Sequence, residues 1–149
     1  MITTEEIKAL RDETGLSVME CKKALDEADG DKEKAKSLLR ERGVAIAAKK
    51  GDRSLGAGTV VSYIHANGAI GVLVELACET DFVAKNPEFK AVGYDIAMHI
   101  AAMNPADNDE LLKQPFIKDP SQNIENLVNG AVQKFGERTE VARFVRFAI

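Results

Sequence analysis

TVVSYIHANGAIGVLVELAC, residues 59–78, consists of two β-branched runs separated by Asn67-Gly68. An Asn-Gly pair between two such runs is the strongest short-range signal for a β-hairpin with a two-residue loop. The second run alternates in hydrophobicity, so one of its faces is expected to be buried. That expected buried face holds Ile70, Val72, Val74 and Leu76. The stretch therefore predicts two antiparallel strands, 59–66 and 69–78, that share a single buried face.

The residues after this hairpin predict two helices and a third strand. Pro87 suits the first position of a helix that begins after Asn86, and Asn104-Pro105 suits its end. A second helix is expected from about Gln122 to Phe135, with Gly136 as its C-terminal cap. The stretch Thr139–Ile149 is rich in Val and Phe, which is typical of a strand. The expected apolar stripe of the first helix is Val92, Ile96, His99 and Met103. This order predicts an α+β core with a three-stranded antiparallel sheet and helices packed on one face.

The residues before the hairpin predict a module of three short helices. Thr3 with Glu6, and Ser17 with Glu20, have the spacing of capping boxes, and Asp31 suits the cap of the third helix. Gly15 and Gly43 are expected to end the first and third helices. The apolar positions at helical spacing are Ile7, Leu10, Val18, Cys21, Leu25, Ala28, Ala35, Leu38 and Leu39. A module of this size, without an aromatic residue, lies near the lower limit for independent folding.

The composition changes where the helical module would end. Every aromatic residue lies in the second part of the chain, beginning with Tyr63, and so does the whole excess of negative charge. Between the parts, residues 44–57 are expected to form a linker with a helical start, because glycines interrupt regular structure there. The predicted organisation is a helical domain at 1–43, a linker at 44–57 and an α+β core domain at 58–149.

Charge and hydropathy disfavour several classes of partner. The net charge is −4 and the pI is about 5.3, whereas a protein that mainly binds nucleic acid needs a basic surface. No apolar run approaches the roughly 18 to 20 residues of a membrane span, and the polar N-terminus does not suit a secretory signal. Cys21 and Cys78 cannot form a disulfide framework. We therefore expect a cytoplasmic protein without nucleic-acid or membrane partners.

The sequence offers little catalytic chemistry. It has no metal-ligand spacing, no phosphate-binding loop that ends in Gly-Lys-Ser/Thr and no G-x-S-x-G turn. His65 is expected on an exposed strand, and His99 in the core. Cys21 and Cys78 are expected to be packing residues rather than nucleophiles. The sequence therefore predicts a protein that is not an enzyme, with no catalytic residues, no cofactor and no metal.

The segment Glu79-Thr80-Asp81-Phe82-Val83 permits two interpretations. In the first, Asp81 caps a turn and Phe82 packs into the core. In the second, Phe82 is presented at a loop tip as an anchor that enters a pocket of a partner, and its acidic neighbour orients it. The lysine pairs Lys22-Lys23 and Lys49-Lys50 are similarly either solvated helix surface or contacts to an acidic partner.

Three motifs occur in order along the chain. They are TGLSVMECKKAL at 14–25, TDFVAKN at 80–86, and FGE at 135–137 followed by VARF at 141–144. These motifs resemble the signatures of the bacterial elongation factor Ts family, and the similarity covers nearly the whole chain. The resemblance implies that residues 1–43 form a ubiquitin-associated-like (UBA-like) three-helix domain and that 58–149 form a core domain of the dimerisation type.

The resemblance also implies a function in protein biosynthesis. The chain would be the guanine-nucleotide exchange factor for elongation factor Tu, binding its GDP-bound and nucleotide-free forms and promoting GDP release by displacing Mg²⁺. The residues implied in displacing the partner's Mg²⁺ are Thr80, Asp81, Phe82 and Val83. The other implied partner contacts are Arg11, Val18, Met19, Lys22, Lys50, Phe135 and Gly136. The alternative function is a UBA-like adaptor or interaction module without exchange activity.

One segment departs from the family pattern. Family members usually carry a long, mostly helical insert between the helix that ends here at Asn104-Pro105 and the motif that begins at Gln114. Here only residues 106–113 join them. Because two chains of short family members can combine, the resemblance implies a homodimer or a 2:2 complex with the partner. The residues expected near a strand edge that could pair in this way are Val141, Val145 and Phe147.

Overall fold

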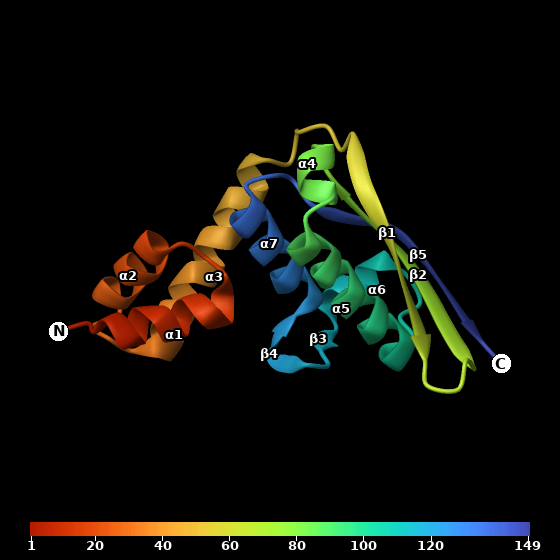
Figure 1. The fold of residues 1–149 in the computed structure, drawn as a ribbon, viewed down its shortest axis with the longest axis horizontal. Helices are drawn as coiled ribbons and strands as arrows, with labels where there is room; N and C mark the ends of the chain where they lie inside the picture. The colour runs from red at the N-terminus through yellow and green to blue at the C-terminus, as the bar shows by residue number, and fades with distance from the viewer.

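Three helices form the N-terminal part of the computed structural model, which describes residues 1–149 (Figure 1). They are α1 (Thr4–Thr14), α2 (Val18–Glu27) and α3 (Lys32–Lys49). The predicted caps are confirmed, because the side chains of Thr3, Ser17 and Asp31 each accept a hydrogen bond from the third backbone N–H of their helix. The buried cluster of this part is Leu10, Leu16, Cys21, Ala24, Leu25, Ala28, Ala35 and Leu39. Val18, predicted on the buried face, is instead 49% exposed.

The third helix continues past Gly43 and reaches Lys49, so the prediction that Gly43 ends it is wrong. Gly43 is buried where α3 crosses α7 (Ile124–Phe135). A Cβ atom at this position would lie 3.0 Å from Oε1 of Gln133 and 3.5 Å from the backbone oxygen of Asn129. The glycine therefore serves close helix packing rather than termination. One helix thus runs from the N-terminal part into the body, and the division at 43 stays a prediction.

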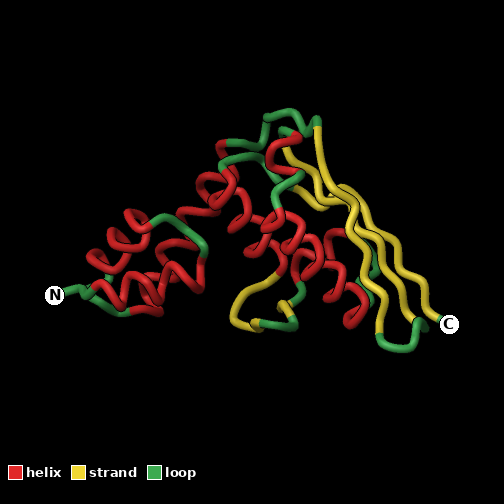
Figure 2. The backbone as a smooth tube through the Cα atoms, in the orientation of Figure 1, coloured by secondary structure: helices red, strands yellow, loops and turns green.

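The body contains a three-stranded antiparallel sheet (Figure 2). Its strands are β1 (Ala57–His65), β2 (Ile70–Cys78) and β5 (Glu140–Ala148), in the order β1-β2-β5. The ribbon shows the helices on one side of this sheet (Figure 1), so the predicted α+β class and sheet are confirmed. The hairpin loop is longer than the predicted two residues. His65 pairs with Ile70, and residues 66–69 form the loop, with the N–H of Gly68 donating to the carbonyl of His65 at 2.8 Å.

Helices and a small hairpin complete the body. The helix α5 (Pro87–Met103) begins after the cap Asn86 and ends at Asn104, as predicted, and α7 ends at Gly136 in a left-handed conformation. The short elements were not predicted. They are α4 (Asp81–Ala84), α6 (Asn108–Lys113), β3 (Pro115–Phe116) and β4 (Asp119–Asn123). The helix α6 occupies most of the segment 106–113 that follows Pro105. No helix in the chain is both long and apolar enough to span a membrane.

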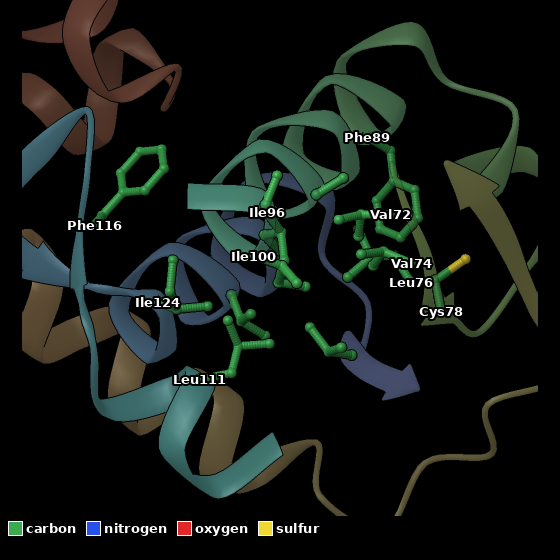
Figure 3. Close-up of a cluster of buried hydrophobic side chains, with 14 of the residues drawn as sticks. Val72, Val74, Leu76, Cys78, Phe89, Ile96, Ile100, Leu111, Phe116 and Ile124 are labelled. Carbon is green, nitrogen blue, oxygen red and sulfur yellow. The ribbon is translucent and has the colours of Figure 1, made fainter. Parts of the chain in front are cut away.

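The main core lies between the sheet and the helices (Figure 3). It is centred on Val72, Val74, Leu76, Phe89, Ile96, Ile100, Leu111 and Ile124. The predicted inner face of β2 is therefore confirmed. Met103, predicted in the buried stripe of α5, is 43% exposed, and Phe89 and Ile100 contribute to the core in its place. Val141, Val145 and Phe147 lie on β5, an edge strand of the sheet, as predicted; the side chain of Val141 is buried, and those of Val145 and Phe147 are exposed.

Candidate partner-binding site

The helix α4, at the top of the view in Figure 1, carries a large aromatic residue, Phe82. Phe82 is 85% exposed, and Asp81 beside it is exposed as well. The next two residues, Val83 and Ala84, are buried against the sheet and α5. The interpretation in which Phe82 packs into the core is therefore wrong. The turn is divided, with its first two side chains in solvent and its last two in the core.

Side chains from distant parts of the sequence hold this turn. The hydroxyl of Thr80 caps α4 by accepting a hydrogen bond from the N–H of Val83 at 3.4 Å. The carboxylate of Glu137 accepts hydrogen bonds from the N–H of Glu79 at 3.1 Å, the N–H of Thr80 at 2.9 Å and the hydroxyl of Thr80 at 2.7 Å. In return, the carboxylate of Glu79 accepts a hydrogen bond of 2.6 Å from the N–H of Arg138.

The hydrogen bonds of Glu137 bring the end of α7 next to this turn. Phe135 is half-buried and packs edge-to-face on Phe89, with ring centroids 5.5 Å apart. Gly136 is exposed, with a φ of 74° that only glycine adopts readily, and it turns the chain so that Glu137 returns toward Thr80. The structure thus brings Phe135 and Gly136 close to the Asp81–Phe82 turn.

The remaining predicted contacts lie on other elements. Val18 and Met19 are the first residues of α2, and Met19 is 81% exposed. Arg11 and Lys22 are exposed on α1 and α2. These four residues belong to the N-terminal helices, which lie apart from α4 in Figure 1. Lys50 is half-buried at the end of α3. The predicted residues therefore form at least two separate surfaces.

The titratable groups in the interior have structural partners. Burial raises the pKa of the Cys21 and Cys78 thiols, so they remain protonated packing residues. His99 is fully buried, and burial lowers its pKa although the hydrogen bond to Gln114 opposes this shift. Its Nε2 lies 2.9 Å from Oε1 of Gln114, and its Nδ1 accepts a hydrogen bond of 3.3 Å from the N–H of Ile117. No three His, Cys, Asp or Glu side chains are arranged to hold a metal ion.

Two clefts lie where α3 meets the body. One, of about 530 Å³, is lined largely by polar side chains of α3, α5 and α7, including Arg40, Asp95 and Lys134. The other, of about 470 Å³, lies beside the second half of α3 and β5. Arg40 bridges the first cleft through hydrogen bonds of 3.3 and 3.5 Å to Ser121. Sequence patterns gave no signal for either cleft, because each forms between elements distant in the chain.

The fold and this site define an α+β protein that presents apolar side chains at the capped starts of two helices, as protein-binding surfaces do. The family model described as "Elongation factor TS" matches residues 27–109. An elongation factor Ts of Acetivibrio thermocellus is 43% identical over 192 aligned residues, covering 99% of this chain and 89% of the relative. One from Thermosipho melanesiensis is 40% identical over 194, covering 100% of this chain and 99% of the relative. The chain belongs to the elongation factor Ts family.

The aligned stretches also show that this chain is shorter than these relatives. They run over 192 and 194 residues, whereas the chain has 149. These relatives therefore carry residues that this chain lacks. Glu137 belongs to one quoted motif, but nothing in the sequence indicated that its side chain reaches Thr80.

Proposed function

We propose that this protein is a guanine-nucleotide exchange factor for elongation factor Tu, acting by binding rather than by covalent chemistry of its own. Membership of the elongation factor Ts family supports the partner. The observation that carries the site is the 85% exposure of Phe82 on a turn that the rest of the body holds in place. A rigid, exposed aromatic ring is typical of an anchor that fills a pocket of a partner.

The proposed mechanism is displacement of Mg²⁺ from the partner. Phe82 and Asp81 insert between two helices of the GTPase domain, with Thr80 and Val83 fixing the turn that carries them. Mg²⁺ requires near-ideal octahedral geometry, so a shift of the supporting helices by about 1 Å is sufficient to weaken its binding. The GDP phosphates then lose their counter-charge and the nucleotide leaves. This chain needs no nucleotide pocket of its own for that role.

The second surface contributes docking. Arg11, Val18, Met19 and Lys22 are exposed on the N-terminal helices, where they contact the same domain of the partner. Contacts from Phe135 and Gly136 lie near the Phe82 turn, and Lys50 adds a peripheral contact. Because exchange is negative coupling between two ligands of one protein, bound nucleotide weakens the binding of this factor by the same ratio. A transient ternary complex is therefore part of the mechanism.

Truncation of the anchor tests this function. Anchors of this kind typically contribute about 2 kcal/mol or more, so Phe82→Ala should slow stimulated GDP release about thirtyfold. Asp81→Ala should slow it less, because an exposed carboxylate contributes less than a ring in a pocket. Release of fluorescent GDP from elongation factor Tu measures both effects. The melting temperature is the control, and it should stay unchanged because Phe82 is exposed. A stable Phe82→Ala variant with unaltered GDP release would overturn the mechanism and favour an adaptor.

We also propose that two copies associate through the outer face of the sheet, as a homodimer or within a 2:2 complex with the partner. The residues that support this proposal are apolar and exposed on the face opposite the helices. They are Val60, Ile64, Leu73, Val145 and Phe147. The strand register places Leu73 directly beside Val145, and Gly71 between Ile64 and Phe147. Ile64, Leu73, Val145 and Phe147 are therefore neighbours on this face, and Val60 lies beside the ion pair of Glu75 and Arg143. Clustered exposed apolar side chains are typical of a protein interface.

Sedimentation measures the oligomeric state directly. The protein should sediment as a dimer at micromolar concentration, and Leu73→Lys should shift it to a monomer because the charge lies at the centre of the proposed interface. Lys113→Ala, on the separate helix α6, is the control and should remain dimeric. A monomeric parent protein that forms a 1:1 complex with the partner would overturn the proposed assembly.

A further inference from the structure

The exposed position of Phe82 requires support from outside its own helix. The helix α4 has four residues, and a single helical turn is unstable on its own because nucleation is unfavourable. Its last two residues are buried and fix one side of the turn. The other side, which carries Asp81 and Phe82, has no core contact to hold it. Besides the bond from the N–H of Lys85 to the carbonyl of Asp81, the bonds before Asp81 therefore fix the direction in which Phe82 projects.

Glu137 supplies most of those bonds. Both of its carboxylate oxygens are occupied, Oε1 by the backbone N–H groups of Glu79 and Thr80, and Oε2 by the hydroxyl of Thr80. The same hydroxyl accepts the N–H of Val83, so a continuous chain of hydrogen bonds runs from Glu137 into α4. Hydrogen bonds to a charged acceptor are roughly twice as strong as neutral ones.

The carboxylate of Glu79 makes the reciprocal bond. The bonds of Glu137 to residues 79–80 and of Glu79 to Arg138 are together called the brace. Glu79, whose side chain is 17% exposed, accepts the N–H of Arg138 at 2.6 Å. The guanidinium of Arg138 in turn donates to the backbone oxygen of Arg53 at 2.6 Å. Two segments 57 to 59 residues apart thus exchange carboxylate-to-backbone bonds across the base of the turn.

We infer that Glu137 is a positioning residue for nucleotide exchange, because its carboxylate caps the 79–80 backbone and so holds Phe82 in its projecting orientation. The inference rests on the proposed function for the consequence in exchange, and on the hydrogen bonds alone for the consequence in structure. Glu137 acts through Thr80 and Phe82 rather than by touching the partner, since both its oxygens are already used within the chain.

The first experiment measures exchange with three variants. Glu137→Ala removes all three hydrogen bonds and should slow GDP release at saturating factor about tenfold, the effect expected from losing bonds to a charged acceptor. Glu137→Gln should restore most of the rate, because an amide oxygen still accepts the backbone N–H groups and its NH₂ donates to Thr80. Glu125→Ala is the matched control and should behave as the parent, because that carboxylate is exposed at the far end of α7 and bonds to no residue of the turn.

A combination with Phe82→Ala tests whether Glu137 acts through the ring. In that background, Glu137→Ala should cause no further loss, since the group it positions is gone. A full tenfold further loss would overturn the inference, because Glu137 would then act on exchange by another route. If Glu137→Ala lowers the melting temperature so far that the protein unfolds during the assay, Thr80→Val replaces it, since it removes the hydroxyl's bonds to Glu137 and to the N–H of Val83 and leaves the backbone bonds of Glu137 in place. Unchanged release by a folded Thr80→Val protein would then count against the brace.

The second experiment needs no partner. The chain has no tryptophan, so Phe82→Trp places a single reporter on the turn. Adding Glu137→Ala should lower the fluorescence anisotropy of this introduced indole toward that of a flexible loop, while Glu137→Gln and Glu125→Ala should leave it unchanged. Unchanged anisotropy in a folded Glu137→Ala protein would overturn the brace. Failure of the parent to accelerate GDP release would instead overturn only the proposed function, since the anisotropy still judges the brace.

Discussion

The N-terminal helices and the body differ in the sequence separation of the residues that their side-chain hydrogen bonds join. Each N-terminal helix is capped by a side chain three residues away, with Glu6 and Glu20 completing capping boxes with Thr3 and Ser17. In the body, side chains reach backbone groups far along the chain. Glu137 holds Thr80, and Arg146 donates to the carbonyl of Ala101 at 3.0 Å. Local caps stabilise single helices, whereas the long-range bonds exist only when the body is folded.

The exposed residue pairs at the starts of α2 and α4 differ in the same way. Val18–Met19 and Asp81–Phe82 are each the first two residues of a helix that follows a hydroxyl cap. Ser17 is braced by Glu20 within its own helix, while Thr80 is braced by Glu137 from another part of the chain. The docking surface therefore depends on its own helices, and the exchange surface depends on the whole body.

Core truncation should give the largest difference between the two regions. Phe89 is fully buried in the body and packs on Phe135, so Phe89→Ala should cost about 3–5 kcal/mol of unfolding free energy. Leu25→Ala, in the smaller N-terminal cluster, should cost about 2–3 kcal/mol. Since every aromatic residue belongs to the body, near-UV circular dichroism reports on the body alone, and far-UV circular dichroism on both regions.

The near-UV and far-UV signals show whether the two regions unfold separately or as one unit. In Leu25→Ala the helical signal should fall at lower urea concentration than the near-UV signal, because the N-terminal helices melt first. In Phe89→Ala both signals should fall early. Coincident transitions in Leu25→Ala would contradict the comparison, since α3 would then couple both regions into one cooperative unit.

Low pH should lower the unfolding free energy of the body through His99, by less than core truncation does. Burial lowers the pKa of His99, so the unfolded chain binds a proton more readily than the folded protein. The stabilising contribution is complete above the ordinary histidine pKa of 6.5, and it is lost progressively as the pH falls below that value. Protonation also removes the acceptor for the N–H of Ile117, which holds the β3-β4 hairpin.

Unfolding free energies at pH 7.5 and 5.5 measure this loss. The decrease between these pH values should be smaller in His99→Gln than in the parent. His65→Gln is the matched control, because His65 is exposed on β1, and it should retain the decrease of the parent. An equal decrease in the parent and in His99→Gln would show that other groups cause the acid sensitivity.

The sequence separation between interacting residues also explains which features could be predicted from the sequence. Capping boxes, the cap at Asn86, the C-terminal Gly136 and the alternating face of β2 are local patterns, and all of them are present. The motifs likewise identified the family. The hydrogen bonds of Glu137 to Thr80 and of Arg40 to Ser121 depend on tertiary proximity, so no local pattern indicates them. The prediction for Val18 is wrong because periodicity alone does not distinguish a core residue from an exposed one at a helix start.

Gly43 illustrates the same limit, since a glycine that local rules assign to a helix end lies in the middle of a helix. Replacing an interior helical glycine with alanine gains about 0.5–1 kcal/mol. At Gly43 the new methyl group would meet Oε1 of Gln133 at 3.0 Å. The amide nitrogen of Gln133 has no hydrogen-bond partner, so this side chain can rotate away at little cost. We therefore expect Gly43→Ala to stabilise the protein by about 0.5 kcal/mol.

Gly130 on α7 provides the matched control for this smallest effect. A Cβ atom there would meet nothing within 4 Å, so Gly130→Ala should show the full propensity gain of about 0.5–1 kcal/mol. The difference between the two variants, measured by urea unfolding, isolates the cost of the contact between α3 and α7. Gly43→Leu should be destabilising, because a longer side chain must also pass the backbone oxygen of Asn129. If Gly43→Leu is as stable as Gly43→Ala, the two helices are not closely packed there, and α3 joins the regions only as a covalent tether.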